Sequence, residues 1–315
     1  MRLRAARPSI IGAAVLFILG GPNARQALAQ PDAPAPHFGV DSTLVLIPAT
    51  VTDPLNRFVL GLHKEDFELS EDGTQQTIKH FSGEDVPLSV GLVFDTSSSM
   101  EDKLRTSRQA ALQFLKSMNP QDEAFLVAFN DQAELTVGFT SLVDEIQTKL
   151  MTLQPHGLTA MLDAAGMALH EMKKAKNPRK AIVIISDGGD NNSRYSASEI
   201  QSLVREADVQ MYAMGVFEPI LLPGLAKEEV SGPRLLSELA EQTGGRAFSA
   251  SDPGDLPSVA ARIGIELRNQ YVLAYSPTNQ NKDGKYRRVE VKVTRPPGMP
   301  DLKVHWRLGY YAPSQ

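Results

Sequence analysis

Apolar runs typical of buried strands alternate with amphipathic helical segments through residues 88–268, and this alternation is the feature that most constrains the fold. The runs LSVGLVF at 88–94 and AIVII at 181–185 are apolar at nearly every position, as strands covered on both faces of a sheet must be. Further strands are predicted at 124–129, 134–138, 209–216 and 246–249, and helices at 103–118, 143–153, 160–174, 197–206, 233–242 and 256–267. The pattern predicts an α/β domain with a doubly wound, mostly parallel sheet.

The two flanks of this region, residues 42–87 and 269–315, have β texture instead. Strands are predicted at 43–51, 57–60, 66–70 and 75–81 on the first flank, and at 270–275, 286–293 and 303–308 on the second. Either flank alone has too few strands to bury a core. We therefore predict one small antiparallel β-sandwich built from both flanks, with the domain at 88–268 inserted in it; two separate β appendages are the alternative.

Residues 1–29 have the pattern of a secretory signal peptide. Arg2, Arg4 and Arg7 precede the apolar run at 10–19, and Ala27-Leu28-Ala29 offers a small-x-small cleavage site before Gln30. Residues 30–41 are predicted to be a linker. We expect an exported protein, located in the periplasm, on the cell surface or outside the cell, with no membrane span in the mature chain; an uncleaved membrane anchor is the alternative.

Composition removes several classes of partner and chemistry. The chain of 315 residues contains no cysteine, which excludes disulfides, thiolate-bound metals and thiol nucleophiles. A formal net charge of -5 gives no electrostatic reason to expect nucleic acid as a partner.

Hydroxyl and carboxylate side chains gather in three loops of the predicted sheet. Asp95-Thr96-Ser97-Ser98-Ser99 follows the strand at 88–94, Gly157-Leu158-Thr159 precedes a helix, and Ser186-Asp187-Gly188 follows the strand at 181–185. Ligands of open α/β sheets bind at the carboxyl ends of strands, so these loops are predicted to share one edge. For a single loop, helix capping by Ser97 and Ser99 is an equally good explanation. The three loops together point to a site for a hard cation, because Mg²⁺, Ca²⁺ and Mn²⁺ prefer oxygen ligands.

In these three loops, residues 88–268 resemble a von Willebrand factor type A domain. All five positions of that family's metal-ion-dependent adhesion site are present, as Asp95, Ser97, Ser99, Thr159 and Asp187. The flanking DFELSEDGTQQTIKHF, YVLAYSPTNQ and WRLGYYAP segments resemble exported bacterial proteins that carry the same domain. The resemblance implies direct binding of a divalent metal ion by the three hydroxyls. Asp95 and Asp187 would bind the ion directly or through water.

The implied function is binding rather than catalysis. Neutral hydroxyl ligands leave the cation, Mg²⁺ first and Ca²⁺ or Mn²⁺ as alternatives, able to accept a carboxylate from a protein partner. We expect no catalytic residues and no organic cofactor, since no G-x-S-x-G, S-x-x-K or H-E-x-x-H motif occurs. Two alternatives remain open at this stage. One is an envelope assembly or structural component that the metal mainly stabilises, and the other is a metal-assisted hydrolase.

Overall fold

The computed structural model describes residues 44–215, 227–250 and 252–314, which all fall within one compact unit, Ser42–Gln315. The predicted signal peptide at 1–29 and linker at 30–41 lie outside the described residues. Within the described ranges, no helix is both long and apolar enough to cross a membrane.

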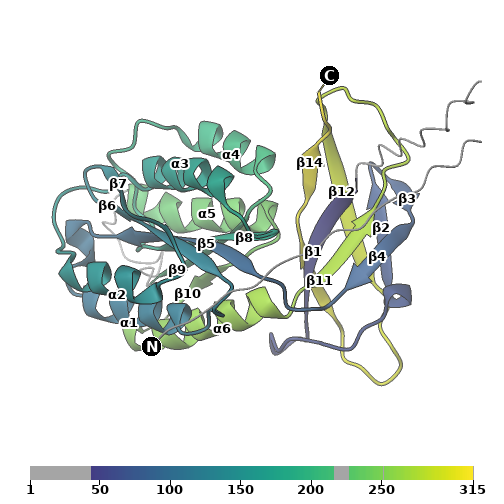
Figure 1. Cartoon of the computed structure of the whole chain (residues 1–315), viewed down its shortest axis with the longest axis horizontal. Coiled ribbons are helices and arrows are strands. Elements are labelled where there is room, and N and C mark those ends of the chain that lie inside the picture. Colours follow the sequence, from purple (N-terminus) through teal and green to yellow (C-terminus); the bar gives the residue numbers. More distant parts are fainter. Residues whose placement is uncertain (1–43, 216–226, 251, 315) are drawn as a thin grey trace, which may run out of the picture. The chain divides into compact units, whose positions relative to one another are not determined.

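The domain that the sequence places between the two flanks, called the central domain, is built on a six-stranded sheet with the order β10-β9-β8-β5-β6-β7 (Figure 1). Its strands are β5 (Leu88–Asp95), β6 (Glu123–Phe129), β7 (Ala133–Thr140), β8 (Arg179–Ile185), β9 (Gln210–Gly215) and β10 (Ala247–Ser249). Only β7, at one edge, is antiparallel to its neighbour; the other five strands are parallel. The predicted mostly parallel sheet with an edge strand near residue 134 is therefore confirmed.

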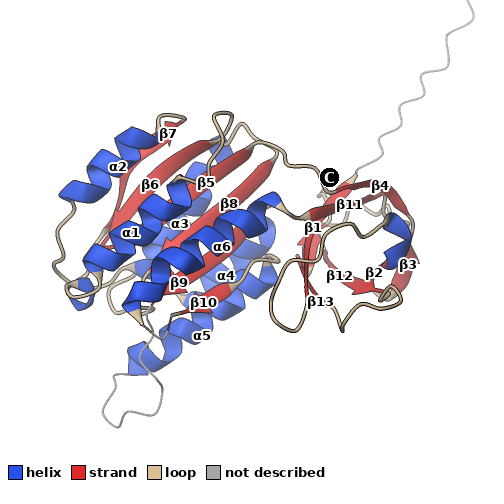
Figure 2. Ribbon diagram, turned by 90° about the horizontal axis from the view of Figure 1, so that it is seen from below, coloured by secondary structure: helices blue, strands red, loops and turns tan. Residues whose placement is uncertain are grey.

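Helices cover both faces of this sheet, as Figures 1 and 2 show. They are α1 (Leu104–Leu115), α2 (Val143–Thr152), α3 (Met161–Glu171), α4 (Ala197–Glu206), α5 (Lys227–Gln242) and α6 (Leu256–Arg268). The core of α1, α2 and α6 receives Val183 and Ile185 from β8, whereas the core of α3, α4 and α5 receives Ile182 and Ile184. Successive side chains of a strand point to opposite faces, so a strand covered twice must be apolar throughout.

The flanking strands form two four-stranded sheets, β13-β1-β11-β4 and β14-β12-β2-β3. Before the central domain lie β1 (Val45–Thr52), β2 (Phe67–Glu71), β3 (Thr74–Gln76) and β4 (Ile78–Ser82); after it lie β11 (Tyr271–Tyr275), β12 (Tyr286–Val293), β13 (Lys303–Trp306) and β14 (Gly309–Tyr311). Each sheet combines strands from both flanks, and residues of β1, β2, β4, β11 and β12 share one apolar core. In Figure 2 the two sheets enclose this core, so the predicted sandwich with an inserted α/β domain is confirmed.

Three predicted strands differ from the structure. The predicted strand at 75–81 is two strands, because β3 pairs with β2 while β4 pairs with β11 in the other sheet. Residues 57–60 form no strand and make only a bridge between Thr52 and Phe58, since Asp53 draws the backbone N–H groups of Leu55 and Arg57 into a turn. The predicted strand at 303–308 ends at Trp306, and a new strand begins at Gly309.

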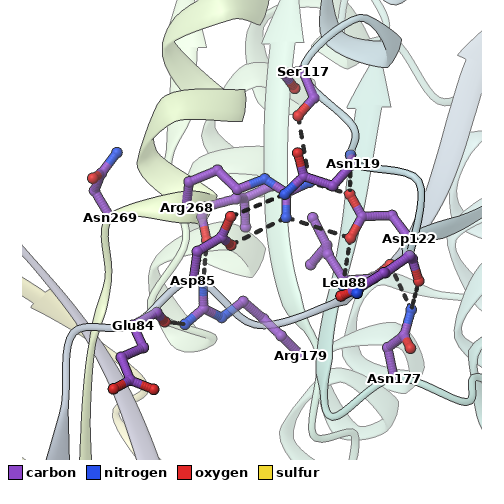
Figure 3. Close-up of polar contacts among 12 residues, drawn as sticks. Glu84, Asp85, Leu88, Ser117, Asn119, Asp122, Asn177, Arg179, Arg268 and Asn269 are labelled. Carbon is purple, nitrogen blue, oxygen red and sulfur yellow. Dashed lines mark hydrogen bonds and ion pairs between the residues drawn. The ribbon is translucent and has the colours of Figure 1, made fainter.

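A cluster of charged side chains lies where the chain passes between the sandwich and the central domain (Figure 3). Arg268, the last residue of α6, pairs with Asp122 and with Asp85, whose Oδ1 is 3.1 Å from Nη1. Arg179 donates to the backbone carbonyls of Leu267, at 2.6 Å, and Glu84, at 3.4 Å. The cluster ties the segment before β5 to the C-terminal end of α6.

One histidine of the sandwich predicts how stability changes with pH. Burial, with the positive charges of Arg246 and Lys303, lowers the pKa of His305 from 6.5 to about 4. Between these pH values the unfolded chain takes up a proton that the folded imidazole does not. The contribution of this histidine to the free energy of unfolding is therefore fully present above pH 6.5 and is lost as the pH falls toward 4.

We expect His305→Gln to reduce the acid-induced loss of unfolding free energy between pH 7 and pH 4 by roughly 2 kcal/mol. Urea unfolding followed by circular dichroism across this range measures the difference. His80→Gln, at an exposed position, is the control and should follow the wild type. Equal acid-induced losses in the wild type and His305→Gln would contradict the prediction.

Candidate metal site

The three loops predicted to form the site lie at the carboxyl ends of β5 and β8 and at the start of α3. Direct hydrogen bonds join them to one another. Ser98 N donates to Gly157 O at 3.1 Å, Asn191 N donates to Thr159 O at 3.0 Å, and Ser186 Oγ donates to Asp95 Oδ2 at 2.6 Å. The first loop thus contacts both the second and the third, and the second contacts the chain that continues from the third.

The first loop is organised around a buried carboxylate. Asp95 is fully buried at the end of β5; its Oδ1 accepts from Ser97 N at 2.8 Å and its Oδ2 from Ser186 Oγ. Ser97 Oγ and Ser99 Oγ are 3.1 Å apart, so two of the predicted hydroxyl ligands lie side by side. Neither hydroxyl caps the 3-10 turn η2 (Ser98–Met100) or α1. Helix capping therefore does not account for these serines.

In the second loop, Thr159 is buried and contacts Asn191, which follows the third loop. Thr159 is 4% exposed, and its N–H donates to Asn191 Oδ1 at 2.9 Å. Gly157 has φ +75, and a Cβ there would lie 2.1 Å from Asp131 Oδ2. That carboxylate cannot move aside freely because its Oδ1 accepts from Leu158 N at 2.9 Å.

Gly157→Ala should therefore lower the free energy of unfolding by about 2 kcal/mol, from the left-handed backbone and the contact with Asp131 together. Denaturant unfolding measures this loss. Gly138→Ala is the matched control, because Gly138 has no atom within 4 Å of an added Cβ. The double variant Gly157→Ala/Asp131→Ala removes the contact and should regain part of the loss. A Gly157→Ala protein as stable as the Gly138→Ala control would contradict this prediction.

The third loop brings a second carboxylate near Asp95. Asp187 Oδ2 is 3.2 Å from the ammonium Nζ of Lys103, and both side chains are largely buried. Burial first, and then the negative charge of Asp187, raise the pKa of Asp95 from 3.8 to about 6, although hydrogen bonds from Ser186 and Ser97 oppose the shift. Two carboxylates that repel each other in a poorly solvated place favour a cation between them.

The donors present fit a hard divalent cation. The set offers two carboxylates and three hydroxyls, and Asp187 already contacts one cationic group. In the ranges 44–215, 227–250 and 252–314, no three His, Cys, Asp or Glu side chains form a group that could hold a metal. The predicted set differs from such a group because most of its ligands are hydroxyl oxygens. That these five residues bind a metal stays a prediction.

Sequence reasoning does not predict the roles of Ser186 and Lys103 in this neighbourhood. Ser186 bonds to Asp95 and also accepts from Gly188 N at 3.0 Å, which joins the first and third loops. The sequence predicts Lys103 only as the first residue of the helix at 103–118. Their signals were weak, a serine beside the aspartate of the motif and a lysine four residues after Ser99.

Asp190 has a structural role at the start of α3. Its Oδ1 accepts from Met161 N at 3.0 Å and from Ser193 Oγ at 2.6 Å, which anchors the start of α3. Burial raises the pKa of Asp190, and these hydrogen bonds oppose the shift. His156, before the second loop, is exposed, and its ring contacts Asn130 and the carbonyl of Gln154.

Comparison with known proteins agrees with this fold. Residues 90–189 match the family described as von Willebrand factor type A domain, and all five predicted ligands fall in that range. An uncharacterized protein of Borreliella burgdorferi is 25% identical over 182 residues, which are 51% of this chain and 53% of that protein. Inter-alpha-trypsin inhibitor heavy chain H4 of Bos taurus is 27% identical over 135 residues, which are 39% of this chain and 15% of that protein.

Among solved structures, the vWF domain of the type V pili tip protein Mfa5 from Porphyromonas gingivalis matches with a TM-score of 0.47 and 15% identity, over 57% of this chain and 95% of that chain. The chain spans about half the length of the first curated relative and a smaller share of the second. The family match and the six-stranded sheet with its covering helices identify the central region: the chain carries a von Willebrand factor type A domain.

Proposed function

We infer that this protein binds a divalent cation through Asp95, Ser97, Ser99, Thr159 and Asp187, and through that cation an acidic group of a protein partner. The observation that carries the inference is the meeting of three loops, tied by hydrogen bonds, around two neighbouring carboxylates. The match of residues 90–189 to the von Willebrand factor type A domain family supports the same role.

The chemistry of the donors favours binding over hydrolysis. Three of the five ligands are neutral hydroxyls, so only the two carboxylates, Asp95 and Asp187, offset the charge of the cation. A cation held this way keeps an affinity for one more anionic oxygen, which a partner carboxylate supplies. Mg²⁺ suits oxygen ligands of this kind, and Ca²⁺ and Mn²⁺ are the alternatives. We assign no catalytic residue.

The place of action follows from the N-terminal pattern. A cleaved signal peptide would deliver the mature chain to the periplasm, the cell surface or the medium. A chain without cysteine needs no disulfide formation there, because packing in the cores of the central domain and the sandwich supplies its stability. We propose an adhesion or protein-interaction role in that location.

A capture experiment tests the proposed function. Immobilised full-length mature protein is incubated with envelope extract in Mg²⁺, eluted with a chelator, and compared with Thr159→Val. Valine keeps the shape of threonine and removes only the hydroxyl, while the backbone bonds between Thr159 and Asn191 remain. Proteins captured by the wild type alone, released by chelator and then shown to bind as purified partners, are the expected result. Capture that persists in chelator, or is equal for Thr159→Val, would overturn the proposal.

A further inference from the structure

Lys103 is the side chain near the candidate metal site that the proposed function leaves unexplained. Its ammonium Nζ lies 3.2 Å from Asp187 Oδ2, and the two side chains are 19% and 11% exposed. Because both groups are partly buried, water and salt screen their attraction less than at an exposed surface. Asp187 is one of the two carboxylates proposed to bind the cation, so a protein cation and a metal ion would share this carboxylate.

The position of Lys103 is set by the loop that carries the serines. Its backbone N–H donates to Met100 O at 2.9 Å, and its carbonyl accepts from Ser107 N at 2.9 Å. Lys103 thus closes the turn that follows Ser97 and Ser99 and occupies the N-cap position of α1. These bonds fix the backbone of Lys103 beside the loop that carries the serines.

Helix stability does not explain a lysine at this position. The N-terminus of a helix carries partial positive charge and disfavours a cation, and the first turn of α1 contains no acidic residue that would compensate. Among the described residues, the contact with Asp187 is the ion pair that offsets this cost. The lysine is therefore explained by the site rather than by the helix.

We propose that Lys103 is a built-in cation of the metal site, which weakens the binding of a divalent cation and strengthens the binding of a carboxylate to the loaded site. This inference rests on the proposed function and concerns its electrostatics. Asp95, Asp187 and Lys103 together carry one negative charge, so a divalent cation converts the site to one net positive charge. Without the lysine the loaded site would be neutral and would attract an anion less.

The two affinities should therefore change in opposite directions when the charge is removed. In Lys103→Met the affinity for Mg²⁺ and Mn²⁺ should rise on the order of tenfold, because the repulsion between ammonium and metal is gone. The affinity of the Mg²⁺-saturated protein for acetate, used as the carboxylate probe, should fall several-fold. A purely structural role of Lys103 would lower both affinities or neither.

Isothermal titration calorimetry with each metal, and acetate titrations of the Mg²⁺-saturated protein followed by amide chemical shifts in NMR, measure both quantities on the mature full chain. Lys103→Gln is a second neutral variant in case methionine disturbs folding, and Lys103→Arg keeps the charge and should resemble the wild type. Lys116→Met removes a positive charge from the exposed far end of α1 and should leave both affinities unchanged.

The outcomes separate this inference from the proposed function. Opposite shifts in both neutral variants support the inference. Metal binding by the wild type with unchanged affinities in both neutral variants overturns the inference and leaves the proposed function standing. Metal binding that appears only when Lys103 is neutralised would overturn the proposed function, and with it the claim that Lys103 strengthens carboxylate binding to the loaded site. No metal binding by any variant overturns both proposals.

Discussion

Replacing Asp187 or Asp95 by alanine should reduce the affinity for Mg²⁺ on the order of a hundredfold or more, because these carboxylates supply all the negative charge among the five proposed ligands. The substitution Asp187→Ala should also release Lys103, whose ammonium then remains near the site without a counter-charge. Both effects act against cation binding. Calorimetric titration of the folded variants with Mg²⁺ measures the loss.

The matched control for this prediction is Glu101→Ala. Glu101 is an exposed acid two residues after Ser99, so its removal changes the net charge by the same amount close to the same loop. Circular dichroism should show all three variants folded. The prediction would be wrong if Asp187→Ala bound Mg²⁺ as tightly as Glu101→Ala does.

Arg268→Met is expected to lower the free energy of unfolding by about 3 kcal/mol, since it leaves a buried carboxylate without its closest partner. Asp122 is 1% exposed and accepts backbone N–H groups from Leu88 at 2.8 Å and from Asn119 at 2.6 Å. Those bonds hold the carboxylate in place, so it cannot turn toward water when the guanidinium is gone. Figure 3 shows Arg268 between Asp85 and Asp122.

Urea unfolding followed by circular dichroism and by the fluorescence of Trp306, the one tryptophan of the chain, measures this loss. Arg295→Met is the matched control, because its partner Asp301 is 91% exposed and a surface pair contributes at most about 1 kcal/mol. The double variant Arg268→Met/Asp122→Asn removes the unpaired charge and should recover part of the stability. Equal losses for Arg268→Met and Arg295→Met would show that the pair contributes no more than a surface contact.

Much of the central domain could be predicted because its elements follow local rules. The continuous apolar run at 181–185 fits only a strand or helix buried on all sides, and its short length favours a strand. Helix α4 occupies 197–206, the range predicted, because its apolar positions have helical spacing and Ser196 and Glu199 form a capping box at its start. Pairings between strands far apart in the sequence do not follow from such local rules.

The break between β3 and β4 shows where sequence reasoning fails. Residues 75–81 follow the turn at Glu71-Asp72-Gly73 like one strand of a hairpin, yet β3 pairs with β2 and β4 pairs with β11, about 200 residues further along the chain. Nothing within this segment states which partner each half will meet. The choice depends on two sheets closing over one core, which is a property of the assembled sandwich.

The sequence by itself determined the alternation of strands and helices in the central domain, the mixed origin of the sandwich, and the three loops rich in hydroxyls and carboxylates. Only the tertiary structure decided that Ser186 bonds to Asp95 and that Lys103 reaches Asp187, 84 residues away. The periodicity of helices and strands depends on residues close together in the sequence. A charge pair between two loops depends instead on which strand ends the folded sheet brings to the same edge. The fold of the site could be foreseen for this reason, and its charge balance could not.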